Sequence, residues 1–159
     1  MVEISEFSGR TLLGLSRPFL AASHPNSNAP EVIGPLWGEM SAIFFKLTLA
    51  RSANPVGVGA MWPDVSGEAG SMIYFAGYEI DAVPEDSGSL EVLELEPGRY
   101  AFVEHVGPMS ELPSAVRSFY STALPQSGEQ GRPGMDLEIY SYPDDPAEPA
   151  RVVIAAPVV

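Results

Sequence analysis

The most constraining feature of this sequence is that one order of apolar segments occurs twice. In the first half, an apolar segment at Arg10–Ser16 precedes an amphipathic pattern from Glu31 to about Ala50, and apolar segments at 56–62 and 72–80 follow. Short segments bounded by glycine and proline indicate strands, whereas apolar residues at three- and four-residue steps indicate a helix. The first half therefore predicts the order β-α-β-β.

The second half repeats this order at a lag of roughly 80 to 90 residues. We expect a strand over 90–106, a helix from Leu112 to before Pro125, and strands at 135–140 and 151–156. The fold class is therefore α+β, with duplicated β-α-β-β units, two main helices and pseudo-twofold symmetry. A groove where two such halves meet is a natural ligand site.

Length and composition predict one domain over 1–159, with halves at roughly 1–82 and 89–159 on either side of a turn-rich segment. The chain has 159 residues, of which 45% are hydrophobic, so one core is sufficient. Its formal net charge is −13, which disfavours nucleic acid and membrane surfaces as partners. The acidity favours a cationic ligand, but it is equally explained by solubility alone.

Several classes of protein are not expected. The sequence contains no cysteine, and its two histidines, His24 and His105, are too far apart to indicate a metal site. We expect His24 on the surface and His105 in a structural turn. No nucleotide-binding or nucleophile-elbow motif occurs, so no cofactor is predicted. An acidic N-terminus and the lack of a long apolar run favour a cytoplasmic protein, and scarce lysine suggests a high-GC bacterial source.

Four stretches together resemble one family. They are Leu36-Trp37, Tyr74-Phe75-Ala76-Gly77, Glu96-Pro97-Gly98-Arg99-Tyr100 with the following His105-Val106-Gly107-Pro108, and Asp136-Leu137-Glu138-Ile139-Tyr140. Their order and spacing resemble the GyrI-like family, which is also known as the AraC-type effector-binding or SOUL-like multidrug-binding domain. The resemblance implies two helices on a curved antiparallel sheet, with a ligand pocket where the halves meet.

Members of that family sense drugs within transcription regulators, protect gyrase from toxins, or hydrolyse strained cyclopropane-bearing alkylators. The predicted repeat begins near residue 10 with no helix-turn-helix before it, so we expect a free-standing domain rather than a transcription factor. Fold alone does not choose among the remaining roles.

The resemblance places a functional glutamate at Glu138. Alternation along the strand puts Tyr140 and Asp136 on the same face as Glu138. A carboxylate near aromatic rings can pair with a cationic ligand, or it can activate water as a general base, with a tyrosine such as Tyr74 or Tyr140 polarising the leaving oxygen. The alternative is an exposed carboxylate on a solvated face.

The predicted ligand-binding residues are mostly aromatic, because ring faces hold planar or cationic molecules. Trp37 lies in the first predicted helix, where an ordinary core position is an equal alternative. The full set is Trp37, Tyr74, Tyr100, Phe102, Leu112, Glu138 and Tyr140.

We therefore expect a protein that holds a lipophilic drug or toxin, which can be cationic, and confers resistance by sequestering it. The alternative is a hydrolase that opens strained rings with Glu138 as general base. A contact with gyrase or another protein is the least favoured hypothesis. The sequence leaves the ligand's identity open, and it is compatible with a monomer or a homodimer.

Overall fold

The computed structural model describes residues 1–46, 55–141, 145 and 147–159. The strands are β1 (Glu3–Phe7), β2 (Arg10–Leu20), β3 (Gly57–Pro63), β4 (Ser71–Glu79), β5 (Glu91–Leu95), β6 (Gly98–Val106), β7 (Asp136–Ser141) and β8 (Arg151–Pro157). The long helix is α1 (Ala29–Lys46). A second helical segment comprises a 3₁₀ turn (Met109–Glu111), α2 (Leu112–Ser118), a π-helical turn (Phe119–Ala123) and α3 (Leu124–Gln126).

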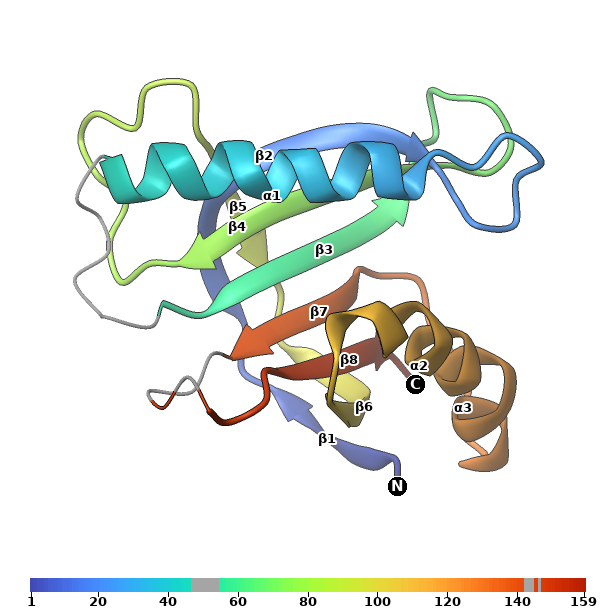
Figure 1. Cartoon of the computed structure of the whole chain (residues 1–159). Coiled ribbons are helices and arrows are strands. Elements are labelled where there is room, and N and C mark those ends of the chain that lie inside the picture. Colours follow the sequence, from blue (N-terminus) through green and yellow to red (C-terminus); the bar gives the residue numbers. More distant parts are fainter. Residues whose placement is uncertain (47–54, 142–144, 146) are drawn as a thin grey trace.

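The described strands form one antiparallel sheet in the order β1-β6-β8-β7-β3-β4-β2-β5. The equivalent strands of the two halves are β1 and β5, β2 and β6, β3 and β7, and β4 and β8. Exchanging the two members of each pair gives the same strand order read in the opposite direction. The pseudo-twofold axis therefore passes between β3 and β7, which pair at the centre. The predicted α+β fold, its duplication and its two main helices are confirmed (Figure 1).

Each half opens with a short strand that the predicted β-α-β-β order lacks. β1 pairs with β6 and β5 pairs with β2, so each half lends its first strand to the other. The residues expected as one strand over 90–106 divide at Glu96-Pro97 into β5 and β6. The chain turns between β1 and β2 at Gly9, whose φ of 81° lies in the region that favours glycine.

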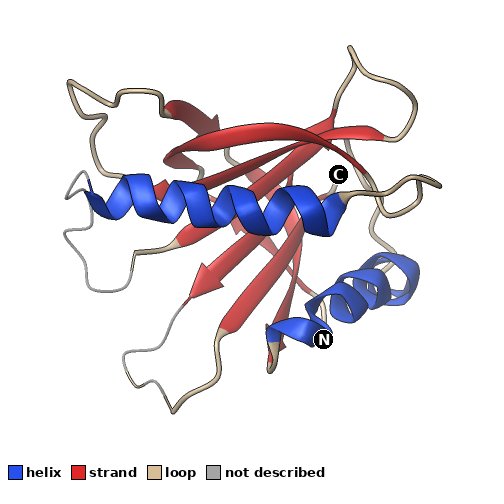
Figure 2. Cartoon of the chain, turned by 45° about the horizontal axis from the view of Figure 1, so that its top comes forward, coloured by secondary structure: helices blue, strands red, loops and turns tan. Residues whose placement is uncertain are grey.

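Both helical segments cover the same face of the sheet (Figure 2). α1 packs on β2 and β4, through Leu36, Met40 and Phe44. It begins two residues before the predicted start at Glu31, and positions 47–50 of the predicted helix lie outside the described residues. The second segment extends to Gln126, past the predicted end before Pro125. We call the covered side the helix face.

The opposite face of the sheet encloses a separate apolar core. Phe7 on one edge strand and Leu95 on the other edge strand pack in one cluster with Val58 and Leu137 of the central strands. Residues from both edges and from the centre meet in this way only because the sheet curls into a half-barrel. No helix among the described residues is long and apolar enough to cross a membrane.

Candidate functional site

Strand β7 places Glu138 at the centre of the helix face. In the register of the sheet, Glu138 lies opposite Gly59 of β3, and Gly59 lies opposite Ala76 of β4. β3 and β7 run between α1 and α2 (Figure 1). Glu138 is accordingly only partly buried, and it lies close to the pseudo-twofold axis between the halves.

A chain of hydrogen bonds ends on the Glu138 carboxylate. The Trp37 indole Nε1 donates to the Tyr74 hydroxyl at 2.9 Å, and this hydroxyl donates to Glu138 Oε2 at 3.3 Å. The Tyr140 hydroxyl donates to the same Oε2 at 2.6 Å. Among the described residues, no side chain donates to Oε1. The predicted residues Trp37, Tyr74, Glu138 and Tyr140 are thus brought together from α1, β4 and β7, and we call them the Glu138 cluster.

Aromatic rings and one leucine surround the Glu138 cluster. The Trp37 ring stands edge-on to Tyr140 at 5.3 Å and to Tyr78 at 5.8 Å between ring centroids. Leu112 of α2 is buried in the same apolar cluster as Tyr140, and Trp37 packs against that cluster from the other half. Trp37 therefore joins the cores beneath α1 and α2, and both predicted roles, core residue and site wall, are compatible with its position.

The cluster changes the proton affinities of its members. Burial raises the pKa of the Glu138 carboxyl above its ordinary value, although the hydrogen bonds from Tyr140 and Tyr74 act in the opposite direction. Burial and the charge of Glu138 raise the pKa of Tyr74, and burial, Tyr74 and Glu138 raise that of Tyr140. Both phenols therefore stay protonated and act as donors.

Two glycines of β3 make the Glu138 cluster possible, and neither was among the residues predicted for the site. A Cβ at Gly59 would overlap the Tyr74 hydroxyl, and a Cβ at Gly57 would lie 3.3 Å from the Trp37 ring. Glycine at alternate strand positions, as in Gly57-Val58-Gly59, is the available signal, because it marks one face that another group approaches closely.

Tyr100 and Phe102 are not brought to the Glu138 cluster. They pair with Pro157 and Ala155 of β8, and Ala155 also lies opposite Leu137 of β7. Paired residues share a face, so Tyr100 and Phe102 lie with Leu137 on the face opposite Glu138. There the Tyr100 hydroxyl donates to the Met135 carbonyl at 3.2 Å.

The histidines lie away from the cluster. His105 Nε2 is 3.2 Å from the Pro108 carbonyl, as a structural turn residue would be. His24 is 3.1 Å from Glu68, its side chain is 13% exposed and Gly70 lies close to its ring, so it lies partly buried at the surface and is less solvated than expected. No group of metal-ligating side chains occurs among the described residues.

The fold and this cluster define a class of protein: a duplicated α+β domain with a partly buried carboxylate and aromatic side chains at the seam of its halves. A family model, the GyrI-like small molecule binding domain, matches residues 2–159. The chain belongs to this GyrI-like family.

Solved structures with low sequence identity share the fold. The structure of SAV2435 bound to tetraphenylphosphonium has a TM-score of 0.76 at 16% identity, covering 100% of this chain and 94% of that one. A Vibrio cholerae integron cassette protein has a TM-score of 0.65 at 16% identity, with 99% and 95% covered. A Listeria innocua hydrolase encoded by lin2189 has a TM-score of 0.55 at 16% identity, with 99% and 91% covered. No curated protein matches the chain significantly.

Proposed function

We propose that this domain binds a lipophilic, cationic small molecule at the Glu138 cluster and acts by sequestering it, as a protein of drug or toxin resistance would. One observation carries the proposal. Glu138 is a partly buried carboxylate at the seam of the halves, it accepts two phenol hydrogen bonds, and it pairs with no cation among the described residues. A charge in that position gains most from a cationic ligand.

The aromatic neighbours suit the same ligand. Trp37 and Tyr140 present rings beside the carboxylate, and a cation over a ring face gains about 0.5–2 kcal/mol. Leu112 supplies an apolar contact from α2. Tetraphenylphosphonium, which binds the similar SAV2435, is both cationic and aromatic, and it is the natural first probe for this chain.

A second candidate function is hydrolysis of a strained-ring electrophile. It is favoured by the raised pKa of Glu138, which makes the carboxylate a stronger base, and by the likeness to a Listeria innocua hydrolase. In this hypothesis Glu138 takes a proton from water, the water oxygen bonds to a ring carbon as the strained C–C bond breaks, and the Tyr74 hydroxyl polarises the substrate oxygen that receives the released electron pair.

A mass-spectrometric time course separates the two functions. The purified chain and its Glu138→Gln variant are incubated with tetraphenylphosphonium and with a cyclopropane-bearing alkylator. Sequestration predicts unchanged cation retained at one molecule per chain, and weaker retention by the variant. Hydrolysis predicts ring-opened product that disappears in the variant, although the variant still binds the alkylator. If neither compound binds or reacts, both functions are refuted.

A further inference from the structure

A second carboxylate lies beside Glu138 on the same face of β7. Asp136 is two residues away, so the two side chains project from backbone positions about 7 Å apart. Both are partly buried. In the register of the sheet Asp136 lies opposite Met61 of β3, and Met61 lies opposite Tyr74 of β4. Asp136 therefore lies on the same face as Glu138, nearer to the start of β7 and outside the Glu138 cluster.

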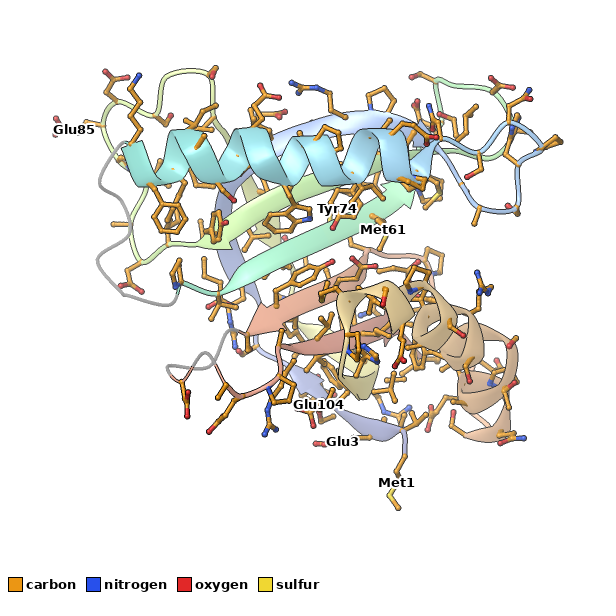
Figure 3. The ribbon with its side chains drawn as sticks, in the orientation of Figure 1. Met1, Glu3, Met61, Tyr74, Glu85 and Glu104 are labelled. Atoms are coloured by element: carbon orange, nitrogen blue, oxygen red, sulfur yellow. The ribbon has the colours of Figure 1, made fainter. Side chains whose placement is uncertain are left out.

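The surroundings of Asp136 repeat those of Glu138 with different residues. The Tyr120 hydroxyl, carried by the π-helical turn of the second helical segment, faces the Asp136 carboxylate. Burial raises the pKa of Asp136, and the interaction with Tyr120 opposes this rise. Tyr120 is 37% exposed, so the side of the site formed by Tyr120 and Asp136 is open to solvent. In Figure 3 Met61 and Tyr74 lie close together beneath α1.

Neither carboxylate has a counter-charge among the described residues. The described ion pairs are Arg10–Glu79, Arg17–Glu39, His24–Glu68, Arg99–Glu129 and Arg151–Glu104. None includes Asp136 or Glu138. Two partly buried carboxylates without cationic partners are costly to hold side by side, and that cost is relieved by ligand charges that match both.

The spacing argues against a single metal ion as that ligand. Oxygen ligands lie about 2.0–2.6 Å from Mg²⁺ or Ca²⁺, so two carboxylates on one ion must converge. Here the side chains leave parallel positions on one strand, and aromatic rings flank them: Trp37 and Tyr140 beside Glu138, and Tyr120 beside Asp136. Rings and separated charges fit an organic cation with a charge at each end.

We propose that Asp136 and Tyr120 form a second subsite, and that the site selects rigid aromatic dications whose charges are about 7 Å apart. This inference rests on the proposed function, because it assigns the first charge of the ligand to Glu138. Met61, which lies opposite Asp136 in the register of the sheet, contacts the ligand at the Asp136 end, and its flexible thioether adapts to a flat ring.

The test is isothermal titration calorimetry with a matched pair of ligands. Methyl viologen is a flat dication with charges at this separation, and N-methyl-4-phenylpyridinium has the same length but only one charge. We expect the wild-type chain to bind the dication at least about tenfold more tightly than the monocation. Asp136→Asn should abolish that preference and change the monocation affinity less than about twofold.

Glu85→Gln is the matched control, since it removes one charge from an exposed loop position far from Tyr74 (Figure 3), and it should leave the preference intact. Equal affinity of the wild-type chain for both ligands overturns the second subsite without any variant, so the test survives a misfolded Asp136→Asn. If the monocation binds in a Glu138-dependent manner but no preference exists, only this inference fails. If neither ligand binds, the proposed function fails with it.

Discussion

Strands β3, β4 and β7 send alternate residues to the two faces of one sheet, and the two faces are built differently. Val58, Phe75 and Leu137 enter the half-barrel core, where they are almost fully buried. Their neighbours Gly59, Tyr74 and Glu138 face the helices and supply glycine, phenol and carboxylate. The first set maximises apolar burial. The second set retains a charge and a conformationally costly glycine, which stability alone does not favour.

Under the proposed function, this contrast means that the alternation of the strands separates residues that stabilise the fold from residues that bind the ligand. Substitutions on the half-barrel side should reduce the free energy of unfolding and leave ligand affinity per folded molecule unchanged. Substitutions in the Glu138 cluster should do the reverse, except where they displace a packed ring. The following predictions test that separation, from the largest expected effect to the smallest.

Leu137→Ala should lower the free energy of unfolding by about 2–5 kcal/mol, because it opens a cavity in a tightly packed core. Leu137 is 0% exposed in the half-barrel core. Urea denaturation followed by circular dichroism measures the loss. Val92→Ala on β5 is the control, since its side chain is 43% exposed and should change stability by less than about 0.5 kcal/mol. Equal losses in the two variants would contradict the assignment of this core.

Gly59→Ala should cost about 1–3 kcal/mol of stability by overpacking, and it should also weaken cation binding. The new methyl group would overlap the hydroxyl of Tyr74, which is completely buried. The hydrogen bonds to Trp37 and Glu138 would be lost together. Gly38→Ala on α1 meets nothing within 4 Å and should instead stabilise the helix by about 0.5–1 kcal/mol. Unchanged cation binding by Gly59→Ala would show that the Glu138 cluster does not depend on this glycine.

Tyr100→Phe should lower stability by about 0.5–1.5 kcal/mol, the worth of its hydrogen bond to the Met135 carbonyl. Because Tyr100 lies on the face opposite Glu138, ligand affinity should not change. Calorimetric titration of the variant with tetraphenylphosphonium checks this. A large loss of affinity would show that the two faces are not independent.

The smallest effect concerns pH. A carboxyl with a raised folded-state pKa adds stability at acid pH, below its unfolded pKa, and this stability is lost as the pH rises through the folded pKa. Glu138→Gln should therefore abolish the part of the pH dependence of stability that comes from this raised pKa. Cation affinity should change in the opposite direction to stability, because it rises as the pH increases through the folded-state pKa and Glu138 becomes charged. Denaturation midpoints and binding constants are measured from acid to neutral pH for the wild type and the variant. If stability and cation affinity of the wild type change with pH in the same direction, the prediction is contradicted.

Much of the fold could be predicted from the sequence, because periodicity and turn residues are local signals. The duplicated order, both main helices and the shared face of Glu138 and Tyr140 follow from spacing alone. Strand β1 was not anticipated, and β5 was expected only as the beginning of a longer strand, since each is only five residues long and pairs with the other half of the chain. Pairing of this kind depends on long-range contacts that no local pattern encodes.

The candidate site could likewise be predicted only as far as local sequence patterns reach. Alternation correctly placed Tyr100 and Phe102 on one face of their strand, but it could not say which side of the whole sheet that face joins. The register through β8 decides this, and it puts both rings opposite Glu138. The spacing of Trp37 on its helix left two roles open, and only the packing of α1 brings its indole within 2.9 Å of the Tyr74 hydroxyl.

The central claim is that Glu138 is the counter-charge for a cationic ligand. Its most direct test is calorimetric titration of tetraphenylphosphonium into the wild-type chain, Glu138→Gln and the Glu85→Gln control at neutral pH. The account predicts one cation per wild-type chain, a loss of affinity of at least about tenfold in Glu138→Gln, and less than about twofold in the control. Equal affinity of the wild type and a folded Glu138→Gln would contradict it.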